Sequence, residues 1–222
     1  MKILGIADVE AKALWDYYSP ERVREADLII SCGDLNPDYL QFLVTMTNKK
    51  LLYVKGNHDT QYETNPPLGC VNIDGRVYEY NGIRILGLGG CMKYKPSRLM
   101  FTENEMKRRI MKVTPQIVLM GGIDILVTHA PAAGYGDLED MPHWGYECFN
   151  ELIDRWKPKL MLHGHVHQNY GVGIKRSMTH AAGTQIYNCF NYTDVDFDDN
   201  NVTNADRSIL YSLYSSLRKQ ED

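Results

Sequence analysis

The chain has 222 residues and carries 24 Lys and Arg against 28 Asp and Glu, which gives a formal net charge of −4 at pH 7. This mild acidity gives no electrostatic reason to expect binding to nucleic acid or to an anionic membrane surface. Hydrophobic residues make up 44%, and no apolar run approaches the ~20 residues of a membrane-spanning helix, so the composition is typical of a globular protein with a sizeable core.

Short apolar runs alternate with helical patterns in the first part of the chain. The runs Lys2–Ala7, Asp27–Ser31 and Leu51–Lys55 are short and β-rich and are followed by Gly or polar residues, which predicts three strands. Between the second and third, Asn36-Pro37 predicts the start of a helix, with Asn as the cap and Pro at the first helical position. Strands separated by helices favour βαβ units in a partly parallel sheet.

The middle of the chain carries the sequence signals of β-hairpins. The dipeptides Asp74-Gly75 and Asn81-Gly82 are strong hairpin-turn signals, and they border the runs Arg76–Tyr80 and Ile83–Leu88. We therefore expect antiparallel strands here, joined by tight turns.

Helices and strands alternate again further along the chain. Thr102, with Glu105 three residues later, forms a capping box and predicts the start of a helix. Ile123–Val127 and Lys159–Leu162 predict buried strands, and Tyr146–Trp156 predicts a helix between them.

The last part of the chain predicts short strands and then a terminal helix. Glycines interrupt the short apolar runs of Gly171–Tyr192, which predicts several strands. Ile209, Leu213 and Leu217 recur at four-residue spacing, so an amphipathic helix is expected over about residues 205–219. No repeat or Pro/Ser-rich linker divides the chain, so we predict one domain over residues 1–222, with helices outside and two sheets inside.

Residues that can bind metal follow several predicted strands at the point where each strand ends. In chain order they are Asp8, Glu10, Asp34, Asn57, His129, His165 and His167. The carboxyl ends of parallel strands meet at one crevice, so these side chains are expected to converge. Seven oxygen and nitrogen ligands without a thiolate are too many for one tetrahedral zinc ion. They suit two divalent ions that share a carboxylate, in the range of Mn, Fe, Zn or Ni.

The ordered motifs resemble those of the calcineurin-like metallophosphoesterase superfamily, whose pattern runs D-x-H, G-D, G-N-H-D/E, H and G-H-x-H. The corresponding residues here are Asp8-Val9-Glu10, Gly33-Asp34, Gly56-Asn57-His58-Asp59, His129 and Gly164-His165-Val166-His167. The likeness extends from about Lys2 to Gly171. It implies an α/β fold, a four-layer αββα sandwich in which two mixed β-sheets are flanked by helices.

The resemblance also implies a role for each metal-binding residue. Asp34 would bridge the two ions. Asp8, Glu10 and His167 would complete the first centre, and Asn57, His129 and His165 the second. The two ions would hold a bridging hydroxide for an in-line displacement at phosphorus. Mn is the expected metal, with Fe, Zn, Ni or Mg as alternatives.

The same resemblance places His58 over the phosphate as a catalytic residue, with Asp59 orienting it. A histidine with a pKa near ~6.5 is a suitable proton donor to the leaving oxygen at neutral pH. Asn57, His58 and His143 are the expected substrate-binding residues, with a structural role for His143 equally open. The stretch from His129 to His143 resembles a subgroup active on phosphodiesters, so we expect a small nucleotide-like or other phosphorylated metabolite as the substrate.

Glu10 departs from the family pattern, which has His at this position. Glutamate is still an oxygen ligand with reach, but it replaces a neutral imidazole by an anion. The added charge would favour harder ions such as Mn or Mg over Zn. We hypothesise that Glu10 ligates, directly or through water, and the alternative is a solvated carboxylate.

A cluster of polar and basic residues follows Gly89-Gly90 and is a second candidate for substrate contact. It consists of Lys93, Tyr94, Lys95 and Arg98. Such a cluster is more often a solvated loop than a phosphate-binding or base-binding site, and we interpret it as such.

The sequence favours a metal-dependent phosphoesterase acting on a small phosphorylated substrate. The alternative is a catalytically weak or inactive binding or scaffold protein of the same fold. We expect neither membrane nor nucleic acid as a partner, and a homo-oligomer is left open. A cytoplasmic location is expected because the cysteines are odd in number, widely spaced and never in a C-x-x-C pair: Cys32, Cys70, Cys91, Cys148 and Cys189.

Overall fold

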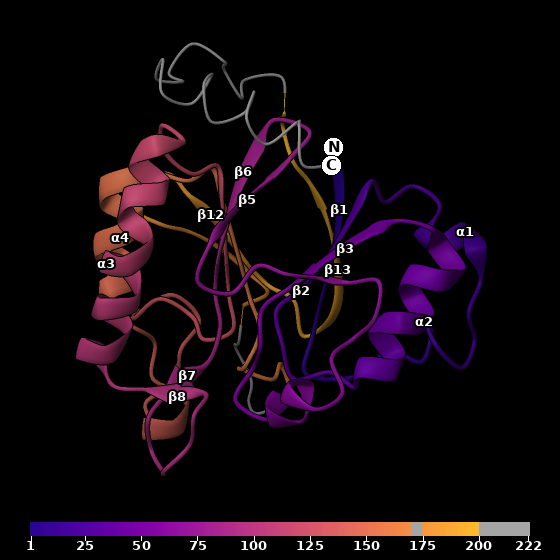
Figure 1. Ribbon diagram of the computed structural model, residues 1–222, viewed down its shortest axis with the longest axis horizontal. Helices are drawn as coiled ribbons and strands as arrows, with labels where there is room; N and C mark the ends of the chain where they lie inside the picture. Colours follow the sequence, from indigo (N-terminus) through magenta and orange to yellow (C-terminus); the bar gives the residue numbers. More distant parts are fainter. Residues whose placement is uncertain (170–174, 200–222) are drawn as a thin grey trace.

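Two β-sheets pack face to face, and helices cover the outer face of each sheet (Figure 1). The structure, a computed structural model, describes residues 1–169 and 175–199. Helices α1 (Pro20–Val23) and α2 (Pro37–Thr47) lie over one sheet. Helices α3 (Glu103–Leu119) and α4 (Glu147–Trp156) lie over the other. The predicted four-layer αββα arrangement is therefore confirmed.

The first sheet has five strands in the order β13-β1-β2-β3-β4. They are β13 (Asn191–Asp196), β1 (Lys2–Ala7), β2 (Leu28–Ser31), β3 (Lys50–Tyr53) and β4 (Val71–Asn72). Strands β1 to β4 run parallel to one another, and only β13 is antiparallel to its neighbour β1. The three strands predicted at the start of the chain form the centre of this sheet.

The second sheet has six strands in the order β11-β12-β10-β9-β6-β5. They are β11 (Ser177–Thr179), β12 (Gln185–Asn188), β10 (Leu160–His163), β9 (Ile125–Thr128), β6 (Ile83–Leu88) and β5 (Val77–Tyr80). The four central strands are parallel, and the two edge strands are antiparallel to their neighbours. Short strands β7 (Cys91–Met92) and β8 (Met100–Phe101) form a separate ribbon (Figure 1).

Both faces of the central strands are buried, which explains their continuous apolar runs. In β1, Ile3 packs into the core between the two sheets, while its neighbour Leu4 packs against the helices. In β9, Ile125 and Leu126 alternate in the same way. Three apolar clusters therefore hold the strands in place: one lies between the two sheets, and one lies between each sheet and its helices.

Two predicted helix starts are confirmed by their capping interactions. The Asn36 side chain accepts a hydrogen bond from the backbone N–H of Asp38 at 2.9 Å, at the start of α2. Thr102 and Glu105 form the reciprocal capping box of α3. Each cap provides a partner for an N–H group that has none within its helix.

The two predicted hairpin turns have different outcomes. Asn81-Gly82 joins the antiparallel strands β5 and β6, with φ of 49° and 86° at the two turn residues, as expected. Asp74-Gly75 is not a hairpin turn, because β4 pairs with β3 in the first sheet and β5 belongs to the second. The dipeptide lies where the chain crosses between sheets, and a turn signal does not specify the strand that follows it.

Three further features concern the terminal helix, the length and hydrophobicity of the helices, and the cysteines. The terminal helix expected at about residues 205–219 lies outside the described residues. Within the described ranges, no helix has the length and apolar character that crossing a membrane requires. All five cysteines are free.

Candidate metal centre

The loops after β1, β2, β3, β9 and β10 meet at the carboxyl ends of the parallel strands, where they surround a cavity of about 430 Å³. This is the position that an open parallel sheet offers to a ligand. Nine residues line the cavity: Asp8, Asp34, Asn57, His58, Tyr94, Pro142, His143, His165 and His167. Seven of these residues were predicted for the site. The eighth, His129, does not line the cavity but contacts Asn57 and Asp34, so all eight are close together.

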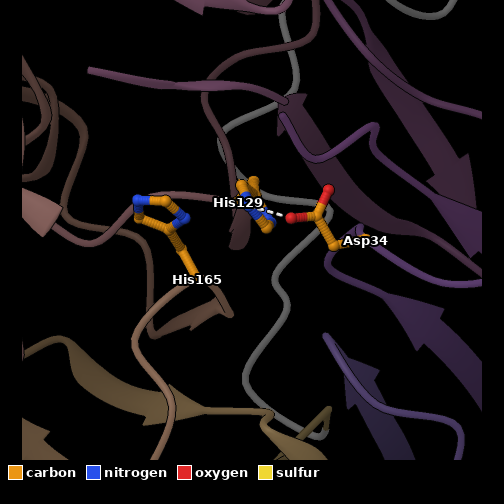
Figure 2. Close-up of side chains that lie close together, drawn as sticks. All are labelled: Asp34, His129 and His165. Atoms are coloured by element: carbon orange, nitrogen blue, oxygen red, sulfur yellow. Dashed lines mark ion pairs between the residues drawn. The ribbon is translucent and has the colours of Figure 1, made fainter. Parts of the chain in front are cut away.

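Asp34, His129 and His165 form a close group of donors (Figure 2). One ligand atom from each of these residues lies within 4.8 Å of the others. His129 Nε2 is 3.3 Å from Asp34 Oδ2 and 3.0 Å from Asn57 Oδ1. Together with Asn57 they make a set of oxygen and nitrogen donors, which we call the Asp34 subsite.

Hydrogen bonds fix which ring nitrogen of each histidine faces this subsite. His129 Nδ1 lies 2.7 Å from the Cys32 carbonyl, to which it can only donate, so Nε2 is the atom that faces Asp34. His165 Nε2 lies 2.7 Å from the Pro142 carbonyl, which leaves its Nδ1 as the lone-pair donor. Such outer partners orient metal-binding imidazoles, so the donor set fits a divalent ion.

Asp8 and His167 lie beside this group and, together with the shared Asp34, form what we call the Asp8 subsite. Asp8 Oδ1 is 4.0 Å from His167 Nε2. Both Asp8 oxygens accept the backbone N–H of His165, at 2.9 and 3.0 Å. The His167 ring packs against Phe190 with 4.7 Å between ring centroids. The carboxylate and the imidazole are thus held side by side.

Three of the predicted metal ligands have left-handed backbone conformations, which are rare for residues other than glycine. The φ angles are 67° at Asp8, 58° at Asp34 and 69° at His165. Each lies in a tight turn after its strand, and strain of this kind is concentrated at functional sites. Gly56 is required because a Cβ there would lie 2.1 Å from Asp34 Oδ1. This contact explains the glycine of the Gly56-Asn57 motif.

The charges of Asp34 and His129 stabilise each other. Burial alone would raise the pKa of Asp34, but the charge and hydrogen bond of His129 outweigh it and lower this pKa to about 2. Burial likewise works against a charged His129, yet Asp34 raises the pKa of His129 to about 9. Without metal, the two residues therefore form a buried ion pair.

The neighbouring groups titrate differently. Burial raises the pKa of Asp8 to about 7, although the charge of His129 lowers it in part. Burial and the charge of His129 lower the pKa of His165 to about 3, so this imidazole is neutral at physiological pH. A neutral imidazole is the form that binds metal.

Asp59 holds two of the site loops together. Its buried carboxylate accepts the backbone N–H of Asp34 at 2.8 Å and that of Gly56 at 2.7 Å. Both hydrogen bonds run to backbone, whereas the sequence predicts that Asp59 orients the ring of His58. Asp34 Oδ1 in turn accepts the backbone N–H of His58 at 2.7 Å. Asp59 therefore positions the loop that presents His58 to the cavity.

Glu10 lies outside the residues that line the cavity. Its side chain is exposed, and Oε1 accepts the backbone N–H of Asn36 at 2.9 Å. Among the predicted ligands it is the one whose side chain interacts with the start of α2.

The loops over the site contain contacts that the sequence did not single out. His143, in the short 3₁₀ helix Met141–His143, lines the cavity, and its Nδ1 is 2.6 Å from Asp140 Oδ2. The three-residue spacing of these two residues could have indicated the pair. Tyr94 also lines the cavity, so the interpretation of its segment as a merely solvated loop was wrong for this residue. A partly buried Tyr94 packs on the core beside α3, a tertiary contact that no local pattern specifies.

Curated proteins give two related sequences. UPF0046 protein C25E10.12 of Caenorhabditis elegans is 25% identical over 172 residues, which cover 64% of this chain and 59% of that protein. UPF0046 protein T07D4.2 of the same organism is 36% identical over 56 residues, which cover 24% of this chain and 14% of that protein. The chain thus matches less than two thirds of the length of either relative.

A solved structure shares the fold. The protein TT1561 of Thermus thermophilus superposes with a TM-score of 0.58 over 85% of this chain and 88% of that one, at 14% sequence identity. A family model described as calcineurin-like phosphoesterase matches residues 1–169, a range that includes every predicted ligand. The chain therefore belongs to the calcineurin-like phosphoesterase family.

Proposed function

We propose that this protein hydrolyses phosphoesters with the help of two divalent metal ions, and that its substrates are phosphodiesters of small nucleotide-like or other phosphorylated metabolites. The observation that carries the proposal is the convergence of Asp34, His129 and His165 at one cavity that is also lined by His58. Family membership supports the reaction class. The resemblance of the stretch from His129 to His143 to a phosphodiesterase subgroup supports the substrate class.

The donor set supports the choice of metal. Carboxylate, amide and imidazole donors without a thiolate suit Mn, with Fe, Zn, Ni or Mg as alternatives. The Asp34 subsite would hold one ion and the Asp8 subsite the other. Divalent ions bound there would act as Lewis acids toward the phosphoryl group and toward a water molecule.

The residues of the chain supply the remaining steps. Asn57, His58 and His143 line the cavity and would contact the phosphate oxygens. His58 is exposed to the cavity and to solvent, so it can exchange its proton. We assign it the transfer of that proton to the leaving oxygen, which neutralises the developing alkoxide. Pro142 and Tyr94 at the cavity wall would exclude water from one side of the bound ester.

The size of the cavity and the free cysteines support the proposed partner and location. A cavity of about 430 Å³ can take a small phosphorylated molecule, which is the proposed partner. The five free cysteines support a reducing compartment such as the cytoplasm. The proposal includes neither a membrane nor a nucleic acid partner.

The experiment is a hydrolysis assay on the purified, metal-stripped full chain. Bis(p-nitrophenyl) phosphate and a panel of cyclic and linear nucleotide phosphoesters are offered with Mn, Zn, Fe, Ni or Mg. Turnover with at least one ion, abolished by EDTA and restored by that ion, is expected. A protein that binds ions but turns over no ester would instead support the alternative of an inactive binding protein.

A further inference from the structure

Glu10 has a partner of its own at the start of helix α2. The carboxylate accepts the N–H of Asn36, and the Asn36 side chain caps the helix through Asp38. The N-terminus of a helix favours a negative charge, and hydrogen bonds to a carboxylate are stronger than neutral ones. Glu10 therefore joins the turn after β1 to the N-cap residue of α2, at a point outside the cavity lining.

The two subsites differ in the number of donors that the chain offers them. The Asp34 subsite has four donor residues, two of which are histidines whose ring orientation is fixed by the Cys32 and Pro142 carbonyls. The Asp8 subsite has Asp8, His167 and the shared Asp34. Because Glu10 is hydrogen-bonded to Asn36, the Asp8 subsite has one donor residue fewer than the Asp34 subsite.

Donor number and rigidity set the affinity of a metal site. Recruiting Glu10 to the Asp8 subsite would break its hydrogen bond to Asn36. In the metal-free protein it would also place a third carboxylate beside Asp8 and Asp34, where like charges repel. Both effects favour the arrangement in which Glu10 stays at the helix.

We infer that the Asp34 subsite binds one divalent ion tightly, that the Asp8 subsite binds the second at least ~tenfold more weakly, and that Glu10 is a positioning residue rather than a ligand. This inference rests on the proposed metal-dependent function, which the weaker binding of the second ion would limit. The occupancy of the second ion, and with it the activity, would follow the concentration of free metal.

The test is a titration of the metal-stripped full chain with Mn²⁺ alone, by calorimetry and by the electron paramagnetic resonance of exchange-coupled Mn pairs. The variants are Glu10→Ala, Glu10→Gln, which keeps an acceptor for Asn36, and Glu10→His. Asp16→Ala, an exposed carboxylate on the same connection, is the matched control. Two classes of site are expected in the unmodified protein and in the Ala, Gln and Asp16 variants. Glu10→His should tighten the weaker class at least ~tenfold.

Three results would overturn the inference. These are two equal Mn²⁺ sites in the unmodified protein, a weaker second ion in Glu10→Ala, or a Glu10→His protein whose second ion binds no more tightly. A chain that binds no Mn²⁺, Zn²⁺, Fe²⁺ or Ni²⁺ at all would overturn the proposed function itself. The number of ions bound thus distinguishes failure of this inference from failure of the proposed function.

Discussion

His58 illustrates how a single residue acquires its role from its surroundings. Its ring lies at the cavity, and its backbone N–H donates to Asp34, so the side chain can be removed without removing a predicted metal ligand. We expect His58→Ala to lower kcat by about 10²–10⁴, the usual contribution of a general acid. Mn content, measured on the same samples by elemental analysis, should not change. A variant that loses its metal would show that His58 acts in metal binding instead.

His129 makes the metal-free protein sensitive to pH. Its pKa is raised from 6.5 to about 9 by Asp34 despite burial, so its contribution to stability is present below pH 6.5 and is lost as pH rises through about 9. Below pH 6.5 the buried, neutral His163 and His165 act in the opposite direction.

The prediction for His129 therefore concerns the window above neutrality. The Tm of the metal-stripped protein should fall between pH 7 and pH 9, and the Tm increase caused by Mn²⁺ should grow over the same range because metal needs the deprotonated ring. Thermal melts followed by circular dichroism measure both. His129→Asn has no titrating ring, so a fall of equal size in this variant would contradict the assignment.

At the scale of elements, Arg109 joins helix α3 to the loops that carry the site. It donates to the Gly89 carbonyl at 2.6 Å and pairs with Asp74, whose carboxylate also accepts the Gly89 N–H at 2.7 Å. The adjoining Gly90 N–H donates to the carbonyl of Lys55, 2.8 Å away, just before the Gly56-Asn57 turn. Hydrogen bonds through Gly89 and Gly90 thus connect α3 to the loop after β3, which carries Asn57 and His58.

Removing Arg109 should therefore destabilise the fold. Arg109→Ala leaves the Asp74 carboxylate and the Gly89 carbonyl without this partner, and we expect a loss of about 1–3 kcal/mol in the free energy of unfolding. Urea denaturation measures it. Arg108→Ala, at the exposed neighbouring position, should change the same quantity by less than about 0.5 kcal/mol. Equal losses in the two variants would show that the network contributes nothing.

At the scale of the whole molecule, the two ends of the second sheet have separate tasks. The loops that carry the predicted ligands follow the carboxyl ends of its strands. Asp124, in contrast, precedes β9 and forms a two-point ion pair with Arg84 at the other end. Both partners are largely buried, with side-chain exposures of 12% for Arg84 and 7% for Asp124.

This separation predicts a variant that changes stability alone. Asp124→Asn removes the carboxylate charge from this largely buried ion pair and one of its two oxygen acceptors, and we expect a loss of about 1–3 kcal/mol in the free energy of unfolding. Mn²⁺ affinity and kcat, measured well below the Tm, should stay within twofold of the unmodified protein, a range of about 0.4 kcal/mol. A large loss of affinity would mean that the two ends are coupled.

The fold and most of the site could be predicted because local signals and tertiary structure agree for them. Strand-end motifs place Asp8, Asp34 and His165 where parallel strands meet, and this follows from topology. The crossover at Asp74 and the cavity position of Tyr94 could not be predicted, because each depends on pairing or packing with distant segments. The same holds for Glu10, whose partner Asn36 becomes its neighbour only after β1 and β2 pair.

The pairing of β13 with β1 determines when the first sheet can be completed during synthesis. Strand β1 emerges from the ribosome before β13, so one of its edges receives its partner only after residues 191–196 have been made. Until then a row of unpaired amide and carbonyl groups beside Asp8 is open to other strands, which is a known route to aggregation. Nascent chains stalled before residue 191 should therefore depend on chaperones more than those released after it.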